Sequence, residues 1–516
     1  MVRITRYRVK KVAAAAAVLL FLASAACTRK QSGELKDSLI AIAINNPVSL
    51  DPYRGNDGGS AFILKHVYNT LFTQNFTTMA PEPSLAERHQ FENNERGQPT
   101  RLRLFLKRGV KFHNGEELKA SDVKFSIERA ITSPYIGHIT GSIEGVEVAG
   151  DYEVLITLKY PFAPILNNLA HFAMSIVNEK AVTEGGESYA QNPVGTGPLK
   201  FVNWVASNRV ELTRWDEYHE EPSRVKDITI RYITDPATAF LELETGGADI
   251  LLSLMPYDVR RVEENPNLRL VNAMDLRVNF VGFNVQKKPF DDVRVRQAIF
   301  HTIDTEALVN TVYQGVGKPG RGPLAATVWA SAADILPPYE YNLDKAKALL
   351  AEAGFPNGFT TTIFTSEAAN LRDTAEVVRG MLARVDIIAD VSVIEWASYL
   401  QATTRGDQEI FLLGWTTVTG DPDYGLEIFH TRSIGSSGNR SFYSNPEVDR
   451  LLDLGRTETN RERRQQIYFD AQRLIHADAP WVYTQEGEVT VGVRSNVRGF
   501  QINPSGQHPL WTVYFE

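Results

Sequence analysis

Short runs of residues that are either continuously apolar or alternate between apolar and polar are spread along the first half of the chain. SLIAIAI at 38–44 is almost wholly apolar, which is typical of a strand buried on both faces. RLRLFLKRGVKF at 101–112 alternates apolar and charged residues, as expected for a strand with one solvent-facing side. EVLITLKY at 153–160 and VKDITIRYI at 225–233 are further strand candidates. These runs predict several strands in a mixed architecture.

Helical signals become denser in the second half. Asp304 is expected to cap a helix that Gly315 ends, and Asp344 to cap the helix over KAKALLAEAG. Asn445, followed by proline, is expected to open a third helix, and Asn460 a long amphipathic one. Strands and helices are interleaved, so the sequence predicts an α/β fold.

The stretch NNPVSLDPYRGNDGGS at 45–60 interrupts these patterns. It is rich in Gly, Asn, Asp and Pro, and it is longer than most connections in compact domains. A loop of this length is either disordered or lines a site.

The N-terminal segment has the pattern of an export signal. Five basic residues precede the apolar run from Val12 to Ala26, which is followed by Cys27, the only cysteine of the chain. The run is too short to span a bilayer comfortably as a helix. The segment resembles a bacterial lipoprotein signal, which implies a signal peptide at 1–26, a lipidated Cys27 and a polar tether at 27–35. The alternative is an ordinary cleaved signal in which Cys27 is incidental.

Length and charge restrict the possible functions. A chain of 516 residues exceeds the size at which a single core stops growing, so at least two lobes are expected. The formal net charge is -8, and removing the five basic residues before Cys27 takes it to -13. So acidic a protein is poorly suited to bind phosphate backbones, and no nucleic-acid partner is expected.

Motifs for bond chemistry are missing from the sequence. No two of the ten histidines lie within 20 residues of each other, so the usual zinc spacings do not occur. The single cysteine excludes CxxC chemistry, and the sequence has neither a G-x-S-x-G elbow nor a phosphate-binding P-loop. We therefore predict no catalytic residues, no metal site and no cofactor.

The segment GWTTVTGDPDYGLEIFH at 414–430 contains the densest set of candidate side chains. Asp421 and Asp423 flank a proline, and in an extended segment two such residues point the same way. A paired-carboxylate site, a turn with side-chain caps and the wall of a ligand cleft are all compatible with this pattern.

Five motifs in one order resemble bacterial extracellular solute-binding proteins of family 5, the peptide/nickel class that serves ABC importers. These motifs are RGVKFHNGEELKASDVKFSIERA (108–130), NPVGTGPLKFVNW (192–204), GFNVQKKPFDDVRVRQAIFHTID (282–304), KAKALLAEAGFPNGF (345–359) and RSFYSNPEVDRLLDLG (440–455). The resemblance implies a bilobal periplasmic-binding-protein-like clamp of type II, cluster C, with an extra inserted domain. It implies that lobe I comprises 36–73, 193–282 and 494–516, that the inserted domain is 74–192, and that lobe II is 283–493.

The resemblance also implies ligand positions. In the family's di- and oligopeptide binders, an aspartate three residues after the tryptophan of segment 414–423 pairs with the peptide's α-ammonium; counted from Trp415, that position is Val418. The arginine that holds the peptide carboxylate in dipeptide binders falls at Thr365 in the register set by Trp396 and Trp415. Burying an ammonium without its partner costs roughly 3 to 5 kcal/mol. The usual charged anchoring is therefore not expected here.

We accordingly expect segment 414–425 to be a cleft wall with neutral contacts. Asp421 is either a displaced charge partner or a cap. Asn56 opens the NDGGS loop at 56–60, which matches a family region bordering the ligand. The expected substrate-binding residues are Trp396, Trp415, Thr417, Val418, Thr419, Asp421, Thr365 and Asn56.

The function implied is that of a monomeric substrate-binding lipoprotein rather than an enzyme. It would lie in the periplasm or at the cell surface, anchored to a bacterial membrane by lipid, and would deliver a short peptide or peptide-like solute to an ABC permease. Glutathione is one candidate solute. A non-peptide solute such as an oligosaccharide, a nickel chelate or an opine-like compound is the main alternative, and an exported hydrolase is a remote one.

Overall fold

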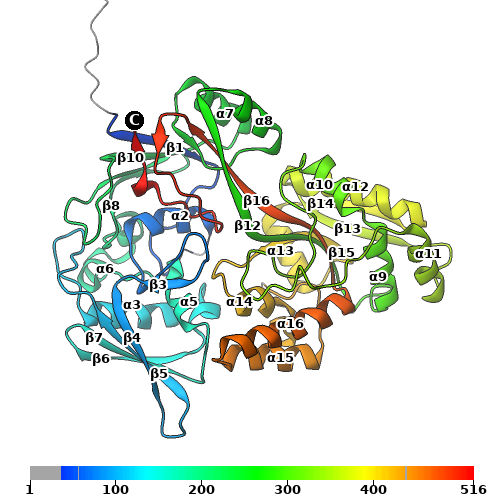
Figure 1. The fold of residues 1–516 in the computed structure, drawn as a ribbon, viewed down its shortest axis with the longest axis horizontal. Helices are drawn as coiled ribbons and strands as arrows, with labels where there is room; N and C mark the ends of the chain where they lie inside the picture. Colours follow the sequence, from blue (N-terminus) through cyan, green and yellow to red (C-terminus); the bar gives the residue numbers. More distant parts are fainter. Residues whose placement is uncertain (1–35, 56, 436–437) are drawn as a thin grey trace, which may run out of the picture.

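Two α/β lobes share one ten-stranded sheet, which confirms the predicted fold class (Figure 1). The computed structural model describes residues 36–516 except residue 56 and residues 436–437. The strand order is β14-β13-β15-β12-β16-β11-β1-β10-β9-β8. The predicted signal peptide, the tether, Cys27 and Asn56 lie outside the described residues.

The lobe I end of the sheet is built on a strand that is buried on both faces. In β1 (Ser38–Ala43), Leu39 and Ala41 enter the large core of lobe I, whereas Ile42 enters a smaller core on the other face. This explains the uninterrupted apolar run in the sequence. The other elements of this end are β8 (Leu199–Val205), β9 (Arg209–Arg214), β10 (Asp227–Tyr232), β11 (Ile250–Leu251), α2 (Gly58–Val67), α7 (Pro236–Thr245) and α8 (Pro256–Glu264).

Two long antiparallel strands, β12 (Leu268–Phe283) and β16 (Trp481–Arg494), run through both lobes and join them. Their pairing shifts between Met274 and Val278, so the intervening residues lie in an irregularity where the chain passes from lobe to lobe. We call β12 and β16 the hinge strands. Both lobes use residues of these strands, so the strands are shared between the lobes.

The lobe II end consists of β13 (Thr360–Ser366), β14 (Ile388–Ile394) and β15 (Ile410–Thr416), covered by helices. Its core is separate from that of lobe I and includes Phe283, Ile363, Phe411 and Tyr468. The helices are α9 (Val293–Thr302), α10 (Thr305–Val312), α11 (Leu343–Glu352), α12 (Ala369–Leu382), α13 (Trp396–Arg405), α14 (Pro422–Leu426), α15 (Pro446–Thr457) and α16 (Arg461–Asp478).

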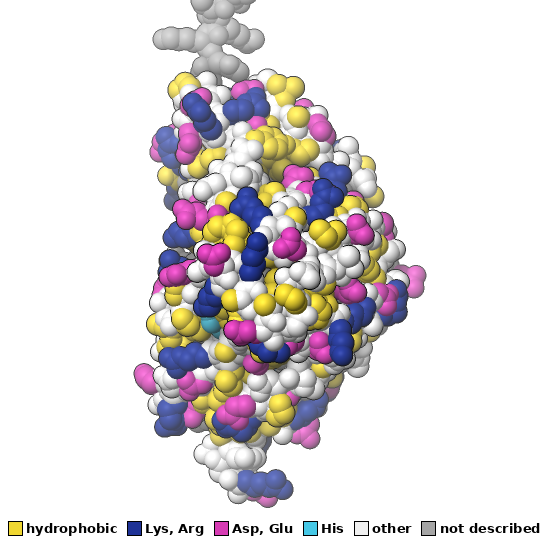
Figure 2. Space-filling view, turned by 90° about the vertical axis from the view of Figure 1, so that its right-hand side faces the viewer, with side chains coloured by type: hydrophobic (Ala, Val, Ile, Leu, Met, Phe, Trp, Pro, Cys, Tyr) yellow, Lys and Arg dark blue, Asp and Glu magenta, His cyan; other side chains and the backbone are white. Residues whose placement is uncertain are grey.

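The outer face of lobe II, which faces the viewer in Figure 2, has mixed charge. On this face the Lys and Arg side chains are interspersed with Asp and Glu, and they do not form a continuous basic stripe. A clustered basic stripe is the usual footprint of nucleic-acid binding. The view therefore gives no support to such a partner on this face.

The inserted segment carries its own four-stranded sheet, in the order β4-β5-β7-β6. Its apolar face is continuous with the core of lobe I, since Leu102, Leu104 and Ile156 belong to the same cluster as Leu39. The elements are β2 (Phe72–Gln74), β3 (Pro81–Pro83), β4 (Ala86–Asn93), β5 (Pro99–Leu106), β6 (Ile143–Gly150), β7 (Glu153–Leu158), α3 (Ala120–Ile131), α4 (Gly137–Thr140), α5 (Ile165–Leu169) and α6 (Glu179–Gly185).

Short elements complete the chain. The 3-10 turns are Phe172–Met174, Gly186–Gln191, Ala383–Val385, Glu427–Phe429, Thr431–Ser433 and Leu510–Thr512, and a small terminal ribbon pairs β17 (Val497–Arg498) with β18 (Tyr514–Phe515).

Most predicted helix starts are confirmed. Asp304, Asn445 and Asn460 each cap a helix by accepting a hydrogen bond from a backbone N–H of its first turn. The prediction for Asp344 is wrong, because Asn342 caps α11 and Asp344 lies within the first turn. Asn342 was overlooked because both residue types cap well and the periodic pattern alone does not separate them.

Two other boundaries differ from the predictions. The strand expected over 101–112 ends at Leu106, and Gly109 adopts a positive φ of 73° in the turn that follows. The NDGGS segment is only partly a loop, because Asp57 caps α2 and residues 58–60 already form its first turn. A Gly-Gly pair favours a loop, but with Asp57 as the cap this pair begins a helix.

Candidate ligand cleft

A cavity of about 820 Å³ lies between the lobes. Its wall combines segments that are far apart in sequence, contributed by lobe I, the inserted domain, lobe II and the hinge strands. Its size is within the range of pockets that enclose a small ligand. Representative lining residues are Asp57, Tyr135, His171, Asp275, Arg277, Thr416, Val418, Tyr424, Glu488 and His508.

The hinge strands supply most of the charge of this cavity. Asp275 and Arg277 come from the irregular part of β12, and Glu488 comes from β16 where the regular pairing with Met274 ends. A register irregularity of this kind redirects side chains and interrupts pairing, which explains how charged residues of a largely apolar strand face the cavity.

One glycine makes room for a hinge side chain. A Cβ atom at Gly414 of β15 would lie 2.4 Å from Nη2 and 2.5 Å from Cζ of Arg277. Any larger residue at 414 would therefore displace the guanidinium group of Arg277.

Arg277 is half-buried, and among the residues that the structure describes its hydrogen-bond partners are neutral. Its Nε donates to Oδ1 of Asn279 at 2.9 Å, and its Nη1 lies 3.5 Å from Oγ1 of Thr416. Burial lowers the pKa of Arg277, and the charge of Asp275 acts in the opposite direction. An arginine remains protonated in proteins, so a positive charge is held at the hinge.

The carboxylates of the cavity are also held by neutral donors. Burial raises the pKa of Asp275 to about 6, against the charge of Arg277 and a hydrogen bond from the N–H of Leu276. Glu488 accepts from the N–H of Gly317 at 3.2 Å and from the side chain of Asn272.

Asp57 contributes a third carboxylate at the lobe I side. Its Oδ1 accepts from the N–H of Ser60 at 2.9 Å, and its Oδ2 is buried without a hydrogen-bond partner among the described residues. Within the part of the chain that the structure describes, the charged groups Asp57, Asp275, Arg277 and Glu488 form no ion pair.

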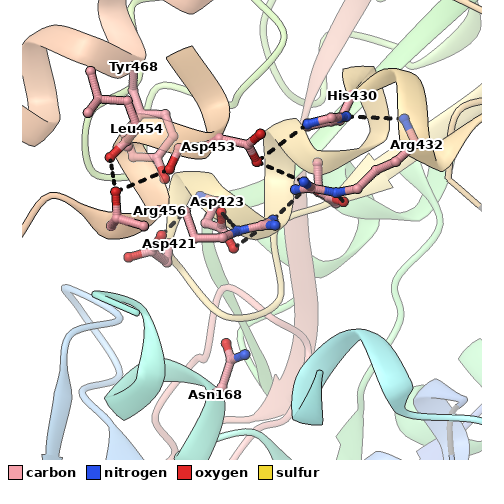
Figure 3. A network of polar contacts seen from close by, with 12 residues as sticks. Asn168, Asp421, Asp423, His430, Arg432, Asp453, Leu454, Arg456 and Tyr468 are labelled. Atoms are coloured by element: carbon pink, nitrogen blue, oxygen red, sulfur yellow. Dashed lines mark hydrogen bonds and ion pairs between the residues drawn. The ribbon is translucent and has the colours of Figure 1, made fainter. Parts of the chain in front are cut away.

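The two aspartates of the GDPDYG motif are in a different situation. Asp421 caps α14 and forms a buried bidentate ion pair with Arg464 at 2.6 and 2.8 Å. Asp423 pairs with Arg456 at 2.9 Å, and burial raises the pKa of Asp423 to about 6. Figure 3 shows both aspartates in a network of ionic side chains of lobe II. Asn168 of α5, in the inserted segment, lies opposite this network. Asp421 is thus a cap, while other residues of the same segment, Val418 and Tyr424, line the cavity.

The other residues expected at the site occupy varied places. Val418 lines the cavity, beside Thr416. Thr417, Thr419 and Thr365 are almost completely buried, and none of them lines it. Thr417 and Thr419 lie in the sharp turn after β15, where the N–H of Gly420 is bonded to the carbonyl of Thr417. Thr365 lies on β13, opposite Val393 of β14.

Neither Trp396 nor Trp415 lines the cavity. Trp396 is 43% exposed at the start of α13 and stacks near Tyr399, with ring centroids 5.8 Å apart. Trp415 stacks on Tyr424 with centroids 5.7 Å apart, and it lines a second pocket of about 340 Å³ between lobe II and the inserted domain. Tyr424 lines both spaces, so this aromatic pair lies where they meet.

The turn after β15 also contacts the inserted segment across the gap. Nε2 of Gln74 donates to the carbonyl of Val418 at 2.8 Å, and Nδ2 of Asn167 donates to the carbonyl of Thr419 at 3.1 Å. The N–H of Ala163 donates to the carbonyl of Arg456 at 2.9 Å. These bonds hold the two sides together, so the motif forms the closing edge of the cleft.

Asp57, Asp275, Arg277 and Glu488 were not identified from the sequence. One signal for two of them was available: in MDLRVNFVGF, Asp275 and Arg277 are the only charged residues and lie two apart, hence on one face of a strand. Charge on one face of an otherwise apolar strand indicates a lined cavity or an ion pair. No local sequence pattern indicates that Asp57 and Glu488 line the same cavity as Asp275 and Arg277.

The described residues contain no group of three or more His, Cys, Asp and Glu placed to hold a metal ion. Among the same residues, no helix is both long and apolar enough to cross a membrane.

Comparisons with known proteins agree with this architecture. Residues 80–437 match the family described as bacterial extracellular solute-binding proteins, family 5, middle. A glutathione-binding protein, GsiB of Pectobacterium atrosepticum, is 32% identical over 483 residues, which are 91% of this chain and 92% of that protein. The dipeptide-binding protein of Escherichia coli is 29% identical over 481 residues, covering 87% of this chain and 89% of the relative.

Solved structures give the same result. The periplasmic binding protein DppA of Helicobacter pylori, in complex with the peptide STSA, has a TM-score of 0.82 at 29% identity and covers 93% of this chain and 98% of its own. The mannopinic acid complex of MoaA from A. tumefacien R10 has a TM-score of 0.79 at 25% identity, covering 93% of this chain and 100% of its own. All four of these proteins are named as binding proteins.

Proposed function

The chain belongs to the bacterial extracellular solute-binding proteins of family 5, and from this membership we propose that it captures a short peptide or peptide-like solute for an ABC importer. The solute would lie in the cavity between the lobes and leave it chemically unchanged. The permease would recognise the closed form, in which the ligand is hidden from water. Glutathione is a candidate because a glutathione-binding relative covers nearly the whole chain.

The observation that carries this proposal is an interlobe cavity with unpaired charges of both signs. Arg277 is suited to a carboxylate, and the three acidic side chains of the cavity are suited to an ammonium group. A peptide offers both groups. Neutral residues at Val418 and Thr365 mean that the charges usual in dipeptide binders are replaced by groups elsewhere in the cleft.

A second candidate is a non-peptide solute such as an opine-like compound. A solved structure at 25% identity is a complex with mannopinic acid, and the absence of an aspartate at Val418 removes the usual contact for a peptide amino terminus. An exported hydrolase is disfavoured, because no nucleophile–base pair was found in the sequence.

We further propose that the protein works as a monomer anchored through lipid on Cys27. Expression of the full chain with Cys27→Ser in a bacterial host would test the anchor. The wild-type protein should fractionate with membranes and the variant should be released, because a lipid anchor supplies the membrane affinity. Equal fractionation of both proteins would contradict the proposal.

The ligand class is tested by calorimetry and thermal shift on the purified protein. The panel comprises tripeptides, glutathione, mannopinic acid, an oligosaccharide and a nickel chelate. Saturable binding of a peptide that is recovered intact supports the proposed function. Binding of only the sugar, the opine or the chelate would contradict it, and turnover of any panel member would indicate an enzyme.

A further inference from the structure

We infer that Arg277 anchors a ligand carboxylate and that Asp57, Asp275 and Glu488 together select a cationic partner, so that the preferred solute carries one carboxylate and no net negative charge. This inference rests on the proposed function and narrows its substrate class. It assigns recognition to the hinge strands and α2, and not to positions 418 and 365.

The first argument is the charge balance of the cavity wall. Three carboxylates face one guanidinium group. His508 does not offset the difference, because burial lowers its pKa to about 4 and leaves the ring neutral at pH 7. A zwitterionic ligand leaves an excess of negative charge on the wall, and an additional ammonium or guanidinium group on the ligand reduces that excess.

The second argument is the way in which the protein treats its other buried charges. Asp51 pairs with Arg129, and Asp421 with Arg464. Arg296 is buried without an ion pair to any described residue, but its Nε, Nη1 and Nη2 all donate to backbone carbonyls, which leaves little capacity for a ligand. The four charged groups of the cavity instead rely on backbone N–H groups and neutral side chains. Charges held in this way keep hydrogen-bonding capacity for a ligand.

The third argument is the geometry of Arg277. Its Nε is used by Asn279, its contact with Thr416 is long, and its Nη2 has no hydrogen-bond partner among the described residues. The fork of an arginine binds a carboxylate through two parallel hydrogen bonds. The missing side chain at Gly414 gives this fork its space beside β15.

Glutathione fits this charge pattern poorly. It carries two carboxylates and one ammonium group, so it would bring a net negative charge into a wall that is already acidic. A tripeptide with a central lysine brings one carboxylate and two ammonium groups and matches the wall better.

The inference is tested by calorimetry on the purified protein with Ala-Lys-Ala, Ala-Ala-Ala, Ala-Glu-Ala, the C-terminal amide of Ala-Ala-Ala, and glutathione. We expect the affinity to fall from Ala-Lys-Ala to Ala-Ala-Ala to Ala-Glu-Ala. Glutathione should bind no more tightly than Ala-Glu-Ala. We expect the amide to bind roughly 10- to 100-fold more weakly than the free acid, as a charge-assisted hydrogen bond is lost.

Variants test the carboxylate contact and the preference for a cationic ligand separately. Arg277→Gln should remove the preference for the free acid over the amide, and Arg277→Lys should restore part of it. Glu488→Gln should reduce the preference for lysine over glutamate. Arg269→Gln is the matched control, because Arg269 lies on the same strand but donates to the carbonyl of Val497, away from the cavity. Melting temperatures establish that each variant is folded.

The outcomes distinguish this inference from the proposed function. Peptides that bind without the charge order, or an Arg277→Gln variant that still prefers the free acid, would overturn the inference and leave the peptide function standing. Tighter binding of glutathione than of Ala-Lys-Ala would also overturn it. If no peptide binds but a sugar or nickel chelate does, the proposed function fails and the inference fails with it.

Discussion

The hinge and the edge of lobe II both contain buried acidic and basic side chains, but they use them differently. At the edge, Asp421 and Arg464 are joined by two short hydrogen bonds. At the hinge, Asp275 and Arg277 are neighbours on one strand and act on each other's pKa, yet they form no ion pair. The ion pair at the edge stabilises the turn after β15, whereas the unpaired charges that line the cavity remain available to bind a ligand.

The physical reason for this difference is the cost of an unpaired charge. An ion removed from water needs a partner, and leaving one uncompensated costs about 3 to 5 kcal/mol. The hinge charges avoid the full cost through neutral hydrogen bonds and contact with an open cavity. Removing a charge should therefore reduce stability at the edge and ligand affinity at the hinge.

The largest effect is expected at the edge. Arg464→Met leaves Asp421 buried without its partner and should lower the free energy of unfolding by about 3 to 5 kcal/mol, measured by urea denaturation. The double variant Arg464→Met with Asp421→Asn should recover part of the loss, because no buried anion is left. Equal losses in the single and double variants would show that the ion pair is not what Arg464 contributes.

The corresponding change at the hinge should separate stability from binding. Arg277→Gln should leave the unfolding free energy within about 1 kcal/mol of the wild-type value, since no ion pair is broken. Ligand affinity should fall by about 1.5 to 3 kcal/mol, the worth of a hydrogen bond to a charged group. A large loss of stability with unchanged affinity would assign Arg277 to the fold.

A pH titration sharpens the comparison at Asp275. Its raised pKa of about 6 means that it is ionised at pH 7 and becomes neutral as the pH falls. Affinity for a cationic peptide should therefore be nearly constant above about pH 7 and fall by on the order of tenfold towards pH 5, since a cation binds the ionised form.

The neighbouring groups of Asp275 allow a clear control. Arg277 keeps its charge throughout, and His508 stays neutral because its pKa is about 4; Asp57 and Glu488 are the other acids of the wall. In Asp275→Asn the decline between pH 7 and pH 5 should be smaller, measured by calorimetry with Ala-Lys-Ala. A decline of the same size would assign the proton to another group.

The smallest effects are expected at the bonds that close the cleft. Gln74→Ala and Asn167→Ala each remove one hydrogen bond to the turn after β15 and should weaken ligand binding by about 0.5 to 1.5 kcal/mol. The dissociation rate should carry the change, because the bonds hold the closed form. Asn203→Ala, which alters an exposed side chain of β8 paired with Glu211, serves as control.

The elements that the sequence predicted are those with a local cause. A continuous apolar run identified β1, and alternation identified β5. Single residues such as Asp304 and Asn445 identified helix starts, because burial and the capping of N–H groups depend on neighbours in sequence. The five motifs indicated the family, which the match over residues 80–437 shows.

The candidate site was predicted less well, and particular residues show why. Asp421 is a good ligand candidate in sequence, but Arg464, 43 residues further on, binds it inside lobe II. Arg277 looks like an ordinary charge in a strand, but a register shift with β16 and the missing side chain of Gly414 direct it toward the cavity. Neither partner could be inferred from local spacing.

The sequence by itself determined the α/β architecture and the family, because periodicity, caps and ordered motifs are written along the chain. Only the tertiary structure decided which charged side chains form ion pairs and which line the cavity without one. Asp57, Arg277 and Glu488 are far apart in the sequence and line one cavity only in the folded chain. The free energy of a charged group is set by the groups that surround it in space, and these are not given by its sequence neighbours.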